Sequence, residues 1–329
     1  MTITRRRIVQ AATASPLLGA LGQRAQAFQP LDSTSLVCGF AVGGTADVMC
    51  RRVAPRIVPG FAKLAVTDNR TGAAGQIAIS HVKGRPADGT SILMTPTSMM
   101  SIYPHIYKKL PYDPIADFTP ISLACVFNYG FAVGPAVPAN VRSAPDFLTW
   151  AKAHPDGANY GSPGAGSTAH FIGTLMGKSA GLDLRHIAYR GGQPAMLDLL
   201  GGNVSGVIAP IGTLEQHMSS GKVRILAVSA DERSRFTPGV PTFAEQGMPN
   251  LSHKEWFGFF LPAKAPDELV RRLNADLRAA LATQDVIDGV GAQGLEAMSS
   301  SPAALGALLS QDLAKWGPIV RQIGFSAES

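Results

Sequence analysis

The chain of 329 residues is 46% hydrophobic and 16% charged, which is typical of a globular protein long enough for two hydrophobic cores. Its formal charge of +6 falls to +2 after residue 27, because four of the 29 basic residues and none of the 23 acidic residues lie before that point. The rest of the chain has no basic run interleaved with aromatic residues and no apolar run of about 20 residues, which argues against nucleic-acid binding and against a later membrane span.

The first 27 residues have the three parts of an export signal in order. Residues 5–7 are arginines, residues 8–21 are weakly apolar, and residues 25–27 (Ala-Gln-Ala) match a cleavage pattern. Residues 4–10 also resemble a twin-arginine signal, so both export routes stay open. The alternative is a disordered basic tail. We expect cleavage after Ala27 and a periplasmic mature protein.

The first part of the mature chain alternates short apolar strands with helices. Apolar runs predict strands, and Met49, Val53 and Ile57 recur on one face of the first helix, which Pro55 should kink. The predicted elements are a strand at 36–41, a helix at 46–57, a strand at 63–67, a helix at 76–82 and a strand at 91–95.

The same alternation continues further along the chain, which indicates βαβ units. The predicted elements are a strand ending at residue 160, a helix at 167–179, a strand at 186–189, a helix at 193–200, a strand at 204–208 and a helix from 266 to 281. We therefore expect an α/β fold with mostly parallel sheets flanked by helices. Two Pro/Gly-containing passages, 133–138 and 249–260, suggest where the chain crosses between domains.

Three loops each follow a predicted strand and open a predicted helix. They are the first loop (residues 40–47), the second loop (residues 72–75) and the third loop (residues 161–168). A helix N-terminus leaves backbone N–H groups free and attracts anions, glycine lets a ligand approach the backbone, and Ser and Thr add hydroxyl donors. The loops are thus candidate anion sites. The alternative is tight turns with ordinary helix capping by Asp47 or Ser167.

Other chemical motifs are weak in this sequence. Cys38, Cys50 and Cys125 are spaced neither as a disulfide framework nor as a zinc site. We interpret Cys38 and Cys50 as buried apolar residues, with one disulfide left open. The seven histidines show no metal-ligand spacing. We expect no cofactor and no metal. A hydrolase using Ser167 and His170 is a minor alternative, because no orienting acid lies nearby in the sequence.

Short segments along the mature chain resemble the Bug (TctC-like) substrate-binding proteins of tripartite tricarboxylate transporters. These segments are GGTAD (43–47), NRTGAAG (69–75), PADGT (86–90), LPYDP (110–114), DFTPIS (117–122), YGS (160–162), YRGG (189–192), DLLGG (198–202) and VPTF (240–243). The resemblance implies a type II periplasmic binding protein with two α/β lobes and a ligand cleft between them. We expect lobe 1 to comprise residues 28–128 and 253–329, and lobe 2 to comprise residues 129–252.

The resemblance also implies a function without catalysis: capture of a small carboxylate by a monomeric receptor that delivers it to membrane permease subunits. Backbone amides, hydroxyls and ordered waters would hold the ligand. The candidate ligand-binding residues are Phe40, Ala41, Gly43, Gly44, Thr45, Asp47, Ala74, Gly75, Ser98, Ser162, Gly164, Ser167, Thr168, Tyr189 and Gly191. A periplasmic ligand sensor for a signalling system is the alternative function.

The sequence departs from the usual family pattern at Cys38-Gly39, before the first loop, and at residues 203–210, which contain no carboxylate. Within the segments named above as the cleft, Asp47 is the only acid, and its place at a helix start suits capping. An amino-acid ligand would need an anionic partner for its ammonium group once water is excluded. We therefore expect an organic acid without an ammonium group.

Overall fold

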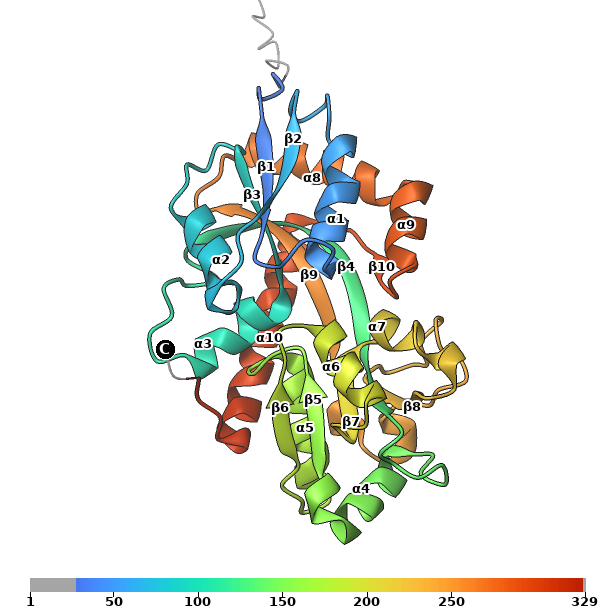
Figure 1. Cartoon of the computed structure of the whole chain (residues 1–329). Helices are drawn as coiled ribbons and strands as arrows, with labels where there is room; N and C mark the ends of the chain where they lie inside the picture. The colour runs from blue at the N-terminus through green and yellow to red at the C-terminus, as the bar shows by residue number, and fades with distance from the viewer. Residues whose placement is uncertain (1–27, 328–329) are drawn as a thin grey trace, which may run out of the picture.

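The computed structural model describes residues 28–327, which form two lobes stacked one above the other in Figure 1. Within these residues the strands form a sheet in the order β2-β1-β3-β9-β4-β7-β5-β6, with β8 and β10 also paired to β4. The strands are β1 (Thr34–Cys38), β2 (Ala65–Asn69), β3 (Ser91–Pro96), β4 (Phe118–Val133), β5 (Asn159–Ser162), β6 (Arg185–Ala188), β7 (Gly206–Pro210), β8 (Arg224–Val228), β9 (Lys254–Pro262) and β10 (Glu296–Ala297).

Helices cover the sheet in both lobes (Figure 1). They are α1 (Thr45–Val53), α2 (Gln76–Lys83), α3 (Tyr103–Ile106), α4 (Ala144–Ala153), α5 (Thr168–Ser179), α6 (Gly192–Leu200), α7 (Ile211–Glu215), α8 (Asp267–Leu281), α9 (Gln284–Gly291) and α10 (Pro302–Ile323). The apolar stripe of α8 illustrates why they pack there, because Leu269, Leu273 and Leu277 lie on one face and are all buried. None of the helices in the described residues combines the length and apolarity that a membrane crossing requires.

The strands predicted from βαβ alternation are confirmed, but the sheet is mixed rather than mostly parallel. β1 pairs in parallel with β2 and β3, and β5 pairs in parallel with β6 and β7. The expectation of mostly parallel sheets is wrong for β4 and β9, which run antiparallel to each other and to their other partners. These strands are almost entirely buried, so their residues show no alternation that would have revealed them.

The crossing between the lobes is made by β4 and β9 (Figure 1). β4 pairs with β9 as far as Asn128 opposite Lys254, and it pairs with β7 from Tyr129 opposite Pro210 onward. The predicted division of the chain at residues 128/129 and 252/253 stays a prediction, and this change of partners is the feature that supports it. Of the two passages that the sequence suggested for the crossing, 249–260 contains the start of β9, whereas 133–138 begins at the last residue of β4. Strands suit a buried crossing because their backbone groups are paired.

Aromatic side chains pack at this crossing. The ring centroids of Phe127 and Tyr129 on β4 lie 5.4 Å apart, and those of Phe127 and Phe257 on β9 lie 6.0 Å apart. Both distances are within the range of favourable ring contacts. The two lobes are therefore joined at β4 and β9 by packed aromatic side chains and not by a flexible linker.

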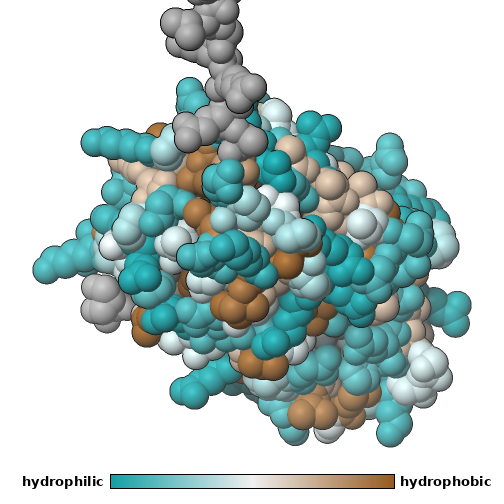
Figure 2. All heavy atoms as spheres, turned by 90° about the horizontal axis from the view of Figure 1, so that it is seen from above, coloured by the Kyte–Doolittle hydropathy of each residue, from teal (hydrophilic) through white to brown (hydrophobic). Residues whose placement is uncertain are grey.

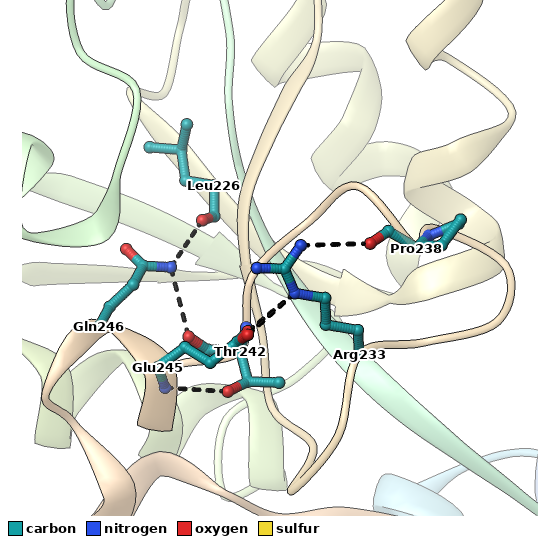
Figure 3. A network of polar contacts seen from close by, with 6 residues as sticks. All are labelled: Leu226, Arg233, Pro238, Thr242, Glu245 and Gln246. Carbon is teal, nitrogen blue, oxygen red and sulfur yellow. Dashed lines mark hydrogen bonds and ion pairs between the residues drawn. The ribbon is translucent and has the colours of Figure 1, made fainter.

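A capping box fixes the chain on its way back from the second lobe (Figure 3). The backbone N–H of Thr242 donates to Glu245 Oε2 at 2.6 Å, and the backbone N–H of Glu245 donates to Thr242 Oγ1 at 3.0 Å. Arg233 Nε donates to Glu245, and Gln246 Nε2 donates to the carbonyl of Leu226 on β8. The segment before β9 is thereby tied to the second lobe.

The surface seen from above is mostly hydrophilic, with small apolar patches between polar side chains (Figure 2). The exposed large apolar residues are scattered over several elements and include Leu64 and Val66 near β2 and Ile77 on α2. Such scattered apolar residues are ordinary for a folded protein. They do not form a continuous apolar surface.

Candidate functional site

The first loop leads from β1 into α1 and exposes backbone at the helix start. Gly44 is the N-cap in an extended conformation without a side-chain cap. Asp47, which is 1% exposed, accepts from the backbone N–H of Gly43 at 2.9 Å and pairs with Arg51 Nε at 2.9 Å. Burial opposes ionisation of Asp47, but these bonds together hold its pKa below the usual value. Asp47 therefore stabilises the turn, whereas Thr45 lies at the partly exposed helix start.

The second loop has unusual backbone geometry. Ala73 and Ala74 have φ values of 44° and 53°, and Gly75 follows at 88°. Two consecutive alanines in the left-handed region are strained, and such strain persists where the surrounding structure holds the backbone in place. The hydroxyl of Tyr103 donates to the carbonyl of Ala74 at 3.1 Å. This loop is thus fixed with exposed backbone at Ala73 and Ala74.

The first and second loops touch each other. A Cβ atom on Gly39 would lie 2.8 Å from the Cα of Gly75, so no side chain fits between them. Asn69 Nδ2, at the end of β2, donates to the carbonyl of Phe40 at 3.0 Å and to Cys38 Sγ at 3.2 Å. The two loops therefore form one surface at the carboxyl ends of β1 and β2.

The hydroxyl groups of Ser162 and Ser167 form hydrogen bonds within the third loop. Ser167 caps α5 by accepting from the backbone N–H of His170 at 3.2 Å, and its hydroxyl donates to the carbonyl of Gly164 at 2.7 Å. Ser162 Oγ lies 3.0 Å from the same carbonyl and 2.7 Å from His186 Nε2. Ser167 therefore caps α5, as the alternative interpretation of the sequence expects. Capping does not exclude an additional contact between Ser167 and a ligand.

The segment after β6 lies against the third loop. The backbone N–H of Tyr189 donates to the carbonyl of Ser162 at 2.9 Å, and that of Gly191 donates to the carbonyl of Pro163 at 3.1 Å. The hydroxyl of Tyr189 donates to Asp198 Oδ2 at 2.7 Å. The structure therefore brings Tyr189 and Gly191 next to the third loop, as a shared site requires.

Ser98 and Thr168 meet at a residue that the sequence analysis missed. Glu255, on β9, is 1% exposed. Its Oε1 accepts from the backbone N–H of Ser98 at 3.1 Å, and its Oε2 accepts from Thr168 Oγ1 at 2.6 Å and from the hydroxyl of Tyr129 at 3.3 Å. Burial raises the pKa of Glu255 to about 7, although the bonds from Thr168 and Ser98 lower it. In the sequence, the only signal for this residue is that one acidic residue immediately precedes the apolar run 256–261.

Ser167 and His170 do not form the pair that the hydrolase alternative requires. The ring Nδ1 of His170 accepts from the backbone N–H of Gly166 at 3.1 Å, and the ring stacks on His186 with centroids 3.9 Å apart. Burial lowers the pKa of His170 to about 3 and that of His186 to about 4, with His186 adding to the shift of His170. Both rings are therefore neutral at pH 7. Ser162 is fully buried, and its hydroxyl already contacts the carbonyl of Gly164 and the ring of His186.

A cavity of about 360 Å³ lies beside these rings, between α5, β6 and the end of α10. His170, His186, Lys178 and Phe325 are among the residues that line it, and none of the candidate ligand-binding residues is. Lys178 Nζ is already bonded to the carbonyls of Gln322 and Ile323. The candidate ligand-binding loops therefore lie outside this cavity.

Cysteine and metal chemistry give no further candidate. Cys38, Cys50 and Cys125 are buried free thiols, so the disulfide left open by the sequence is not formed in the structure. Residues 28–327 contain no group of three or more His, Cys, Asp or Glu side chains arranged to hold a metal ion.

Comparisons with known proteins agree with this architecture. The family described as "Tripartite tricarboxylate transporter family receptor" (TctC) matches residues 49–325. The protein BugT of Bordetella pertussis is 27% identical over 90% of both chains. A Pseudomonas protein, "UPF0065 protein in tcbD-tcbE intergenic region", is 30% identical over 99% of this chain and 96% of its own length.

Solved structures with the same fold include proteins with bound carboxylates. The periplasmic binding protein BugD is 28% identical, with a TM-score of 0.81 over 92% of this chain and 100% of its own. A Rhodopseudomonas palustris protein with adipate is 29% identical, with a TM-score of 0.82 over 90% of this chain and 98% of its own. MatC of the same organism, with bound malate, is 25% identical, with a TM-score of 0.79 over 89% and 100%. The chain belongs to the TctC family of solute receptors, which includes the Bug periplasmic binding proteins.

Proposed function

We propose that this protein is a periplasmic receptor that binds a small organic carboxylate between its two lobes for uptake by a tripartite tricarboxylate transporter. On this proposal the chain is exported, cleaved after Ala27, and acts as a monomer that hands its ligand to the membrane permease subunits. It performs no catalysis. The adipate and malate bound by two related proteins support a carboxylate as the ligand class.

The position of the candidate residues carries the proposal. The first loop, the second loop and Ser98 follow the carboxyl ends of β1, β2 and β3, and the third loop and Tyr189 follow those of β5 and β6. Ligands of open α/β sheets bind outside the carboxyl ends of their strands. The start of α1 adds unpaired N–H groups and partial positive charge, which suit a carboxylate.

Side-chain charge has a small part in this proposed site. Asp47 is neutralised by Arg51, so it neither repels a carboxylate strongly nor attracts a cation. Backbone N–H groups, the hydroxyl of Thr45 and bridging waters would supply the hydrogen bonds. Binding of this kind selects for carboxylate groups and leaves the body of the ligand to shape complementarity.

The test is a binding screen on the exported protein. Mass spectrometry of small molecules that co-purify with it should find an organic acid, and calorimetry with mono-, di- and tricarboxylates should give a dissociation constant for at least one class. Absence of binding to every member of the panel at millimolar concentration would refute the proposal. Uptake assays with and without the permease genes would then distinguish transport from sensing.

A further inference from the structure

Glu255 links segments of the chain that lie on both sides of the lobe crossing. Ser98 follows β3 in the first lobe, whereas Thr168 begins α5 in the second lobe. Both donate to the one carboxylate, at 3.1 and 2.6 Å, and the hydroxyl of Tyr129 on β4 adds a third bond at 3.3 Å. The carboxylate therefore lies at the N-terminal turn of α5. It contacts Thr168, the residue that follows the Ser167 cap.

Among the residues that the structure describes, no cationic side chain pairs with this buried carboxylate. Of the ion pairs formed within residues 28–327, none includes Glu255. The titratable groups that act on it or respond to it come from three elements: Tyr103 on α3, Cys125 and Tyr129 on β4, and Asp312 on α10. On β9 itself, the neighbouring Lys254 is exposed to solvent.

None of these neighbours gains a positive charge near neutral pH that would balance the negative charge of Glu255. Burial raises the pKa of Tyr103, Tyr129 and Cys125, so all three stay neutral. Burial lowers the pKa of His170 to about 3, so its ring is neutral as well. The nearby Asp312 adds to the rise of the Glu255 pKa, which lies at about 7. Glu255 can therefore bind or release a proton near neutral pH.

We propose that Glu255 couples carboxylate binding to proton uptake. This inference rests on the proposed function, because it requires an anion at the loops beside the start of α5. A ligand carboxylate brings a second negative charge close to Glu255 in a region that excludes water, where like charges repel strongly. Glu255 relieves the repulsion by taking one proton from solvent, which forms an O–H bond on the carboxyl group and breaks none in the protein.

Protonation also reverses one hydrogen bond. In the ionised state the hydroxyl of Thr168 donates to Glu255 Oε2. A proton on Oε2 donates to Thr168 Oγ1 instead, and the hydroxyl hydrogen of Thr168 then becomes available to another acceptor. The N–H of Ser98 can continue to donate to Oε1. The protonated state therefore presents one more donor at the start of α5, which favours an anion.

Calorimetry on the wild-type mature chain tests the coupling directly, with adipate and malate as the probes. Titrations at pH 7 in buffers of different ionisation enthalpy give the number of protons bound, and we expect about half a proton per ligand. Carboxylate ligands stay ionised above pH 6.5. We expect affinity to be roughly five- to twentyfold tighter at pH 6.5 than at pH 8.5, because the protonated form of Glu255 binds the anion better.

Two variants assign the effect to Glu255. E255Q imitates the protonated state, because its amide can accept from Ser98 and donate to Thr168, so we expect binding without proton uptake and with affinity independent of pH. D312N is the matched control. It removes another carboxylate of the junction, which accepts from Trp256 Nε1 at 2.7 Å and Thr97 Oγ1 at 3.1 Å and which raises the Glu255 pKa, so proton uptake should persist with its midpoint shifted to lower pH.

The outcomes are distinct. Binding with no proton uptake by the wild type, or uptake that persists in folded E255Q, overturns the inference and leaves the proposed function intact. Absence of binding to the whole carboxylate panel refutes the proposed function and the inference with it. Thermal melts establish that the variants are folded, and the wild-type proton count decides the question if E255Q does not fold.

Discussion

Gly39 and Gly164 both lie in or beside the candidate site, but an added methyl group would meet different surroundings. At Gly39 it would lie 2.8 Å from the Cα and 3.0 Å from the carbonyl oxygen of Gly75, and backbone atoms cannot move aside cheaply. At Gly164 it would meet no atom within 4 Å. We expect G39A to lower the free energy of unfolding by about 1–3 kcal/mol.

G164A is the matched control for stability, and we expect its unfolding free energy to change by less than about 0.5 kcal/mol. Its carboxylate affinity should nevertheless fall, because the methyl group projects into the space proposed for the ligand. Chemical denaturation and calorimetry measure the two effects separately. If G164A binds as the wild type does, the third loop does not contact the ligand at this position.

Thr45 tests whether the first loop binds the ligand or only forms a turn. Thr45 begins α1, and its side chain does not cap the helix. We expect T45V to weaken carboxylate binding by about 1–2 kcal/mol, as for a lost hydrogen bond to a charged group, with little change in stability. Calorimetry and thermal melts check this. Unchanged affinity combined with a large loss of stability would favour the structural role.

At the scale of elements, local patterns predicted the βαβ units well. The predicted helix at 76–82 is α2 (Gln76–Lys83), and the predicted strand at 91–95 is β3 (Ser91–Pro96). Pro55 ends α1 at Val53 and places a 3-10 turn after it, close to the expected kink. Such elements depend on residues within one or two turns, so a single sequence carries enough information for them.

The crossing and the centre of the candidate site could not be predicted in the same way. β4 and β9 are separated by more than 100 residues, and their pairing depends on the whole sheet. The contact between Gly39 and Gly75, and the meeting of Ser98 and Thr168 at Glu255, join residues that are distant in the sequence. No local period or motif encodes these contacts, whereas the helix N-termini of the loops could be recognised from glycine and hydroxyl residues.

The stacked histidines of α5 and β6 predict sensitivity to acid. The pKa values of His170 and His186 are lowered by burial to about 3 and about 4, below the ordinary value of 6.5. The unfolded chain therefore binds protons that the folded chain does not, and stability falls as the pH drops from 6.5 toward 4. Each ring contributes a loss on the order of 1–3 kcal/mol.

Glu255 has the opposite effect on stability over part of this pH range, because its protonation stabilises the folded protein as the pH falls. Its pKa is raised to about 7, so its contribution to stability is complete below the ordinary value and is lost as the pH rises through 7. The histidine effect is isolated by the double variant H170N/H186Q, whose side chains can accept from the backbone N–H of Gly166 and form a hydrogen bond with the hydroxyl of Ser162. We expect chemical denaturation between pH 6.5 and 4.5 to show a smaller loss of stability in this variant. An equal loss would show that other groups cause it.

For the molecule as a whole, we expect charge at the lobe junction to decide which ligands fit. The sequence identified Asp47 as the only acid in the named segments, but the structure adds Glu255 beside Ser98 and Thr168. Asp47 is paired with Arg51, and Asp198 accepts from the hydroxyl of Tyr189. Each of these carboxylates already has partners within the protein, and Glu255 and Asp47 are buried. None presents a free anionic group to a ligand.

An ammonium group bound in this site would lose water without forming a direct ion pair, because each of these carboxylates is already hydrogen-bonded within the protein, and this loss is costly. We therefore expect succinate to bind more tightly than aspartate, and glutarate more tightly than glutamate, in calorimetry at pH 7. Each pair has the same carbon chain and the same two carboxylates, so the comparison isolates the ammonium group. Tighter binding of the amino acid in both pairs would contradict this expectation. Repeating the titrations with E255Q would then identify the partner, because loss of the amino-acid preference would show that Glu255 becomes accessible and pairs with the ammonium group.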